Sequence, residues 1–158
     1  MPRVGITGQT YLNTGSYENP QWERATILHD LTVGSETTAI AVKNKGVNVV
    51  RYMEGLREVP LDFECDWEPG HPVFDALLNS HWTSEVLDLL ILDGRLTKEG
   101  SQGLRAGFIA TKFERGEPLD DAMTASASLK LAAEWEHDPE WVMVGAGGTI
   151  TTIYDCEP

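Results

Sequence analysis

Four acidic residues at alternate positions are the side chains whose type and spacing come nearest to a reactive site. They are Asp62, Glu64, Asp66 and Glu68. The residues between them are apolar, a period of two that predicts a half-buried antiparallel strand with the carboxylates on its wet face, about 7 Å apart. Calcium sites need a loop that curls round the ion. A straight strand cannot bring four carboxylates together, so the row predicts a solvated stripe with no metal and no cofactor.

The other reactive side chains lack the spacing that catalysis needs. His71 and His81 do not form an H-E-x-x-H motif. The run 144–148 (VGAGG) lacks the strand–helix–strand context of a dinucleotide loop and is interpreted as a hinge. Two cysteines, Cys65 and Cys156, do not make a disulfide framework. A non-enzyme is expected; a metal-dependent enzyme using the acidic row is the alternative, which sensitivity to a chelator would support.

Alternating hydrophobicity predicts the elements that position these residues. Strands are expected over 22–33, 37–43, 61–68 and 85–93, the last of them apolar throughout and therefore central. Two longer strands, within 104–111 and 123–131, are joined by a polar turn, and the second is lined with small residues. The run 71–80 (HPVFDALLNS) predicts the one helix, with Pro72 in its first turn and an apolar face.

This order of elements predicts a mainly β fold, an antiparallel sandwich or barrel with one short flanking α-helix and extended arms. Residues 1–20 show no clear period and are interpreted as an N-terminal arm. Residues 137–158 contain glycines and a short β-prone piece, 149–154, and are interpreted as a C-terminal arm. Residues 21–136 form the β domain. Within it, residues 44–58 (NKGVNVVRYMEGLRE) form either a hairpin or a long protruding loop, a type of segment that usually carries contacts.

Charge is distributed unevenly along the 158 residues, whose net charge is −13. Residues 1–60 carry six acids and six bases, whereas the remainder carries nineteen acids and six bases. Specific or tight nucleic-acid binding is not expected, because phosphate contacts need a basic surface. No run of 18 apolar residues occurs, so no membrane span is expected, and the N-terminus lacks the pattern of a signal peptide.

Three phrases, in order, resemble the tail tube proteins (major tail proteins) of long-tailed bacteriophages. They are GLREVPLDFECDWEPGHPVFDALLNSHWT, VLDLLILDG and GSQGLRAGFIATKFERGEPLDDAMTASASLKL. The first resembles that family's strand, turn and helix, the second its buried strand, and the third its final pair of strands. The resemblance covers about residues 22–135, and its motifs are specific only as an ordered set.

The resemblance implies a structural, non-enzymatic subunit of the virion that assembles in the host cytoplasm. Such subunits form hexameric rings that stack into a tube, through which DNA passes to the host without specific binding. Tape-measure, tail terminator and tip proteins are the implied partners. On this view Val47, Arg51, Tyr52 and Met53 are candidate contacts between rings, and Ala125, Ala127 and Leu129 are candidate contacts within a ring.

The acidic excess suits the wall of such a channel, because like charge repels phosphate. Asp62, Glu64 and Asp66 are one candidate set of lumen-facing residues, and the segment 114–121 is another. A different class of function, a small-molecule-binding β-barrel module, remains an alternative. It predicts an enclosed apolar cavity, whereas the tube subunit predicts polymers.

Overall fold

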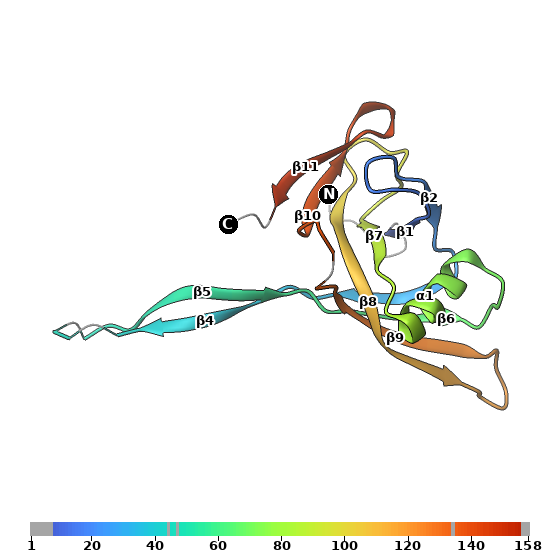
Figure 1. Cartoon of the computed structure of the whole chain (residues 1–158), viewed down its shortest axis with the longest axis horizontal. Coiled ribbons are helices and arrows are strands. Elements are labelled where there is room, and N and C mark those ends of the chain that lie inside the picture. Colours follow the sequence, from blue (N-terminus) through green and yellow to red (C-terminus); the bar gives the residue numbers. More distant parts are fainter. Residues whose placement is uncertain (1–7, 44, 47, 134, 156–158) are drawn as a thin grey trace.

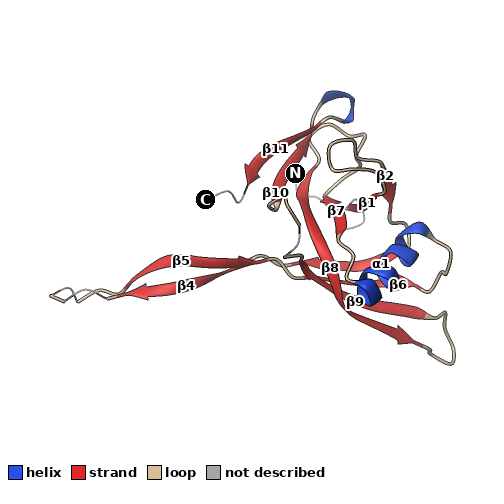
Figure 2. Cartoon of the chain, in the orientation of Figure 1, coloured by secondary structure: helices blue, strands red, loops and turns tan. Residues whose placement is uncertain are grey.

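The computed structural model of the chain describes residues 8–43, 45–46, 48–133 and 135–155. Its elements are β1 (Gln9–Asn13), β2 (Trp22–Arg24), β3 (Leu28–Val33), β4 (Glu36–Val42), β5 (Arg51–Glu58), β6 (Leu61–Asp66), α1 (Pro72–Thr83), β7 (Leu87–Leu92), β8 (Gln102–Gly116), β9 (Thr124–Leu131), β10 (Glu140–Val144), a 3₁₀ turn (Ala146–Gly148) and β11 (Ile150–Asp155). Figure 2 shows that strands make up most of the regular structure of the chain. The mainly β prediction is confirmed.

The main sheet is antiparallel and curls toward a barrel. Its strand order is β2-β1-β7-β8-β9-β6-β3. The two end strands, β2 and β3, are consecutive in the chain and are separated only by residues 25–27. So short a link cannot cross a flat seven-stranded sheet, whose strands lie about 4.8 Å apart. The ends must therefore approach each other, and the expected strand over 22–33 is divided between them.

The core fills the inside of this curled sheet. Buried side chains from β1, β6, β7, β8 and β9 meet the apolar face of α1. Phe74 of α1 packs edge-on against Trp67, with ring centres 5.0 Å apart, and against Phe113, at 5.9 Å. The helix begins at the expected proline, and His71 caps it by accepting a hydrogen bond from the Val73 amide at 3.2 Å. The predicted helix and the central buried strand β7 are thus both observed.

Strand β8 is long enough to pair with two strands, β10 and β9, along one edge. Residues 102–105 pair with β10, and residues from 108 onward pair with β9 on the same side. The opposite edge pairs with β7 over residues 103–108. A small second core lies where β10 covers β1 and β7; it contains Tyr11, Leu90, Leu92, Val142 and Val144.

The predicted arms are wrong over most of their length. β1 lies inside the main sheet between β2 and β7, with Tyr11 and Leu12 buried. β10 and β11 form a hairpin that joins the sheet through β8, and residues 144–148 form its turn instead of a hinge. β1 escaped prediction because it has few apolar residues, and β10 because its apolar residues are adjacent and do not alternate; both pair with strands far away in the chain. Residues 1–7 and 156–158 lie outside the described residues.

Candidate assembly surface

A two-stranded hairpin, made of β4 and β5, projects from the body of the molecule (Figure 1). It continues the β3–β6 pair: β3 leads into β4, and β5 leads into β6. The interruption falls at Pro60, which has no amide hydrogen to donate to a ladder. There the Gly34 amide donates to the Pro60 carbonyl at 2.9 Å, which links the two strands across the break. The projection is therefore an extension of the sheet.

The hairpin begins earlier than the sequence predicted. Its ladder runs from the pair Glu36–Glu58 to the pair Val42–Arg51, so the projecting segment is 36–58 and not 44–58. Gly46 at the tip has φ +88°, a left-handed conformation that favours glycine. The expected strand over 37–43 was correct, but the alternation 51–58 carries little apolar contrast and did not show that β5 pairs with it.

The hairpin exposes apolar side chains that its own subunit does not cover. Every described residue of β4 and β5 is exposed except Gly55, which is half-buried. Tyr52 is 69% exposed, Met53 56% and Leu56 85%. Large exposed apolar patches mark interaction sites. Arg51, Tyr52 and Met53, the candidate contacts between rings, lie on this surface; Val47 lies outside the described residues.

The acidic row lies on the outer face of β6, as the sequence predicted. Leu61, Phe63 and Cys65 are buried, whereas Asp62 is exposed and Glu64 and Asp66 are half-buried. Asp62 accepts a hydrogen bond from the Ser128 hydroxyl at 2.6 Å, and Asp66 contacts His29 Nε2 at 2.8 Å. Glu64 has Ser126 as its cross-strand neighbour on β9. Within the described residues, no cluster of three or more acids, histidines or cysteines could hold a metal.

The assignment of Ala125, Ala127 and Leu129 to contacts between neighbouring subunits is wrong. All three point into the core and are at most 2% exposed. Their strand, β9, is also paired on both edges, by β8 and β6. Ala127 lies opposite both Phe63 and Phe113, so its small side chain makes room for these aromatic rings inside the subunit.

Among the described strands, β8, β9, β6 and β3 are neighbours in this order, and one backbone edge on each side of the group has no partner. Within the described residues, β3 is paired only by β6, and the segment 112–116 of β8 is paired only by β9. Unpaired backbone amides and carbonyls are a template for pairing with another chain. Sequence alternation located these strands but could not show which of them lie at an edge.

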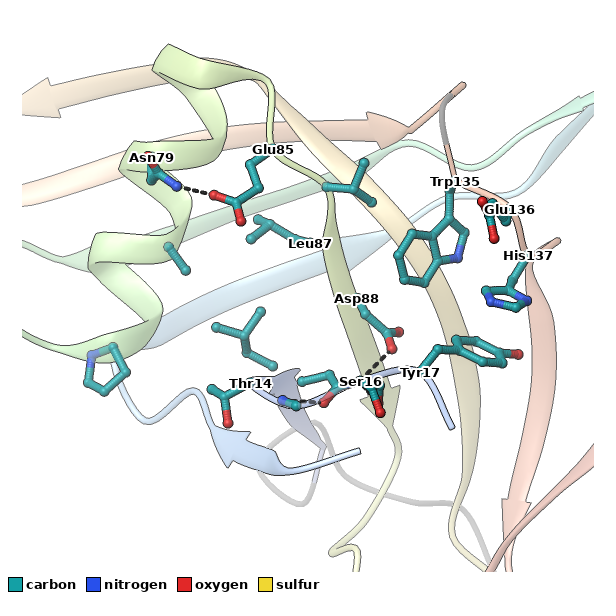
Figure 3. A pocket seen from close by; sticks show the side chains of 16 residues that line it. Thr14, Ser16, Tyr17, Asn79, Glu85, Leu87, Asp88, Trp135, Glu136 and His137 are labelled. Carbon is teal, nitrogen blue, oxygen red and sulfur yellow. Dashed lines mark hydrogen bonds between the residues drawn. The ribbon is translucent and has the colours of Figure 1, made fainter. Parts of the chain in front are cut away.

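A polar cluster, which the sequence did not reveal, ties the N-terminal segment to the central strands (Figure 3). Asp88 accepts hydrogen bonds from Arg105 Nη2 at 2.8 Å and from Asn13 Nδ2 at 2.9 Å. Arg105 also donates to the Tyr17 carbonyl at 3.0 Å, and its guanidinium lies 4.0 Å from the centre of the Tyr17 ring. The side chains of Asp88 and Arg105 are only 6% and 10% exposed.

Tyr17 in turn connects this cluster to the start of the C-terminal hairpin. Its hydroxyl donates to Glu140 Oε1 at 2.9 Å, and its ring stacks on His137 with centres 3.5 Å apart. Burial, together with the hydrogen bond to Glu140, raises the pKa of Tyr17 to about 12. Gly107 lies under Trp135, where a Cβ atom would come within 2.5 Å of the indole. Tight aromatic packing therefore fixes the segment that leads to β10.

The groove beside this cluster is a candidate for a small-molecule site, but its polar groups are already used. It measures about 690 Å³ and runs between α1 and the segment 13–17. Asn79 donates to Glu85 (Figure 3). Asp88 accepts hydrogen bonds from Arg105 and Asn13. In the part of the chain that the structure describes, every buried side-chain nitrogen and oxygen has a partner. This groove is not the enclosed apolar cavity that the ligand-binding alternative predicts.

The Cys65 thiol should not react with thiol reagents in the folded protein. It is fully buried, and burial, with the neighbouring Asp66 and Glu64 charges, raises the pKa of its thiol to about 11. The thiolate is the reactive form. In a Cys156→Ser variant at pH 8, a thiol reagent such as Ellman's reagent should not modify Cys65 until denaturant is added. Rapid modification of the native protein would show that β6 is not held in the core.

Comparison with known proteins gives a likeness of fold. No family model matches the chain, and no curated protein matches its sequence. The SPP1 tail tube is similar over 82% of this chain and 76% of its own, with a TM-score of 0.69 and 10% identity. The tail of an empty gene transfer agent particle is similar over 84% of this chain and 96% of its own, with a TM-score of 0.67 and 11% identity.

Contractile injection systems contain the same architecture. The cap of the anti-feeding prophage, which terminates its tube, is similar over 96% of this chain and 92% of its own, with a TM-score of 0.61 and 13% identity. Among the described residues, no helix has the length and apolar character to cross a bilayer. The similarities to these solved structures show that the chain has the fold of tail tube proteins.

Proposed function

We propose that this chain is the structural subunit of a phage tail tube. Copies form rings, six to a ring as in the C6-symmetric tail of the gene transfer agent, and the rings stack into a hollow conduit. The observation that carries the proposal is the projecting β4–β5 hairpin, whose exposed apolar side chains need a partner from outside the subunit. The role is structural and not enzymatic, and its place is the virion tail, assembled in the host cytoplasm.

Within a ring, neighbouring subunits join through their open sheet edges. The edge of β3 that no described strand occupies pairs with residues 112–116 of β8 in the next copy, a head-to-tail contact that closes when the rotation suits a ring. Backbone pairing replaces the small-residue contacts that the sequence suggested. Between rings, Arg51, Tyr52 and Met53 of the hairpin make the contacts. The ends of the tube meet tape-measure, terminator and tip proteins.

The four strands β8, β9, β6 and β3 line the channel with their outer face. Asp62, Glu64 and Asp66 then face the lumen beside Ser126 and Ser128 of β9. An acidic wall repels DNA phosphates, so DNA passes without binding. Support comes from the observed burial pattern of β6, which presents these carboxylates on the face away from the core.

A charge reversal tests which residues face the lumen. Glu64 makes no side-chain hydrogen bond among those observed, so Glu64→Lys should leave tubes intact. The added positive charges should make these tubes retain short duplex DNA at low salt and release it at high salt. Asp120→Lys, in the exposed β8–β9 turn, is the matched control and should not retain DNA. DNA retention by the Asp120 variant alone would place the segment 114–121 in the channel instead. Electron microscopy of the unmodified chain tests the tube function itself.

A further inference from the structure

Exposed apolar side chains are concentrated on two hairpins. Of fourteen large apolar side chains that are exposed in the described chain, seven lie on the projecting hairpin between Ile40 and Leu56. Four more lie on the C-terminal hairpin, which comprises β10, β11 and their turn: Trp141, Met143, Ile153 and Tyr154. Isolated exposed apolar residues need no explanation, but two concentrations of this kind do.

The two hairpins carry opposite charge. The distal part of the projecting hairpin, residues 40–53, contains Lys43, Lys45 and Arg51 and no acid. The segment 138–155 contains Asp138, Glu140 and Asp155 and no lysine or arginine. The rest of the molecule is strongly acidic, so residues 40–53 are its one concentrated basic segment in sequence. Opposite charges around apolar centres are the usual arrangement of complementary interfaces.

The C-terminal hairpin also offers a free backbone edge. Within the described residues, β11 is paired only by β10. Tyr154 is 71% exposed and lies directly opposite Trp141, so the two rings share one face. The Trp141 indole is held by a hydrogen bond to Gln102 Oε1 at 3.2 Å. An apolar face beside an unpaired edge is a ready surface for another chain.

In its own subunit only the base of the projecting hairpin, residues 54–57, lines a groove with Asp138 and Asp155. The distal part extends away from the body and cannot cover the C-terminal hairpin of the same copy (Figure 1). We propose that the distal hairpin of one copy packs on the C-terminal hairpin of a second copy, with its lysines and arginine toward Asp138 and Asp155. This inference rests on the tube function and names the receiving surface. The two surfaces differ, so the contact is heterologous and propagates from copy to copy, as stacking requires.

Cross-linking between differently marked copies tests the contact. One protein carries Tyr52→Cys, another Tyr154→Cys and a third Trp82→Cys, each with Cys156→Ser; Trp82 is 77% exposed on α1 and serves as the control position. Buried Cys65 stays unreactive in all three. Tubes assembled from the first two proteins and treated with a short bismaleimide should give at least roughly fivefold more cross-linked dimer than tubes containing the control position.

A charge exchange provides an independent readout. Arg51→Glu should lower the yield of tubes roughly tenfold by setting like charges together, and Asp155→Arg in the same chain should restore most of it. Asp120→Arg, outside the proposed contact, should not restore it. Tubes that form normally but show no preferred 52–154 cross-link, or only 52–52 cross-links between projecting hairpins, would overturn the inference and leave the tube function standing. Failure of every variant and of the native chain to assemble would overturn both.

Discussion

A chain in which residues 40–53 are replaced by Asn-Gly is expected to fold normally and to form no tubes. Ala39 and Glu54 are cross-strand partners, so a two-residue turn can join them with little strain. None of the removed residues belongs to either core. We therefore expect a melting temperature within a few degrees of the native chain, and complete loss of stacked tubes in electron micrographs.

The control for this shortened hairpin keeps its length, its apolar strands and its basic residues. Asn48→Ser, a single change near the tip, should preserve tubes. Normal tubes from the shortened chain would show that the projection is not needed for stacking. A shortened chain that failed to fold would show that the hairpin supports the sheet, contrary to its exposure.

Asp88→Ala is expected to lower the free energy of unfolding by about 3–5 kcal/mol. The substitution leaves the Arg105 guanidinium buried without its carboxylate, and removing one partner of a buried ion pair costs this much. It also frees Asn13, so the segment that leads to Tyr17 loses its anchor on β7. Urea titration at neutral pH, followed by tryptophan fluorescence, measures the change.

Two further variants show whether the loss of stability comes from the unpaired Arg105 charge. Glu136→Ala removes an exposed carboxylate beside the same groove and should change stability by less than about 0.5 kcal/mol. Asp88→Leu combined with Arg105→Met removes both charges and should recover much of the loss, because apolar pairs often replace buried ion pairs without cost. A neutral result for Asp88→Ala would mean that the ion pair does not hold the N-terminal segment in solution.

Periodicity identified the elements whose two faces differ most. β6, α1 and the β8–β9 pair were predictable because each has one apolar face over a long run. β7 was predictable because it is apolar over nearly its whole length. The same signal failed for β1 and β10. β1 is five residues long with two apolar positions, and β10 has four adjacent apolar residues that do not alternate, so neither shows a period. Their burial depends on partners far away in the chain.

The assembly surface was harder to predict, because it depends on which strands end the sheet. The acidic row on the outer face of β6 and the candidate contacts at 51–53 were predicted from the sequence. In the structure residues 51–53 and Asp62 are exposed, and Glu64 and Asp66 are half-buried. The small residues of β9 suggested close approach of a neighbour, but the same pattern arises when alanines make room for Phe63 and Phe113. The buried Asp88–Arg105 pair left no signal, since its members are 17 residues apart and lie on two different strands, β7 and β8.

Electron microscopy of the purified, unmodified chain over a range of concentrations tests the central claim directly. The account predicts hollow tubes built of stacked rings, with six copies to a ring and the β4–β5 hairpin reaching from one ring to the next. It is contradicted if the protein remains monomeric at every concentration and is also absent from the tube of tailed particles made in the host.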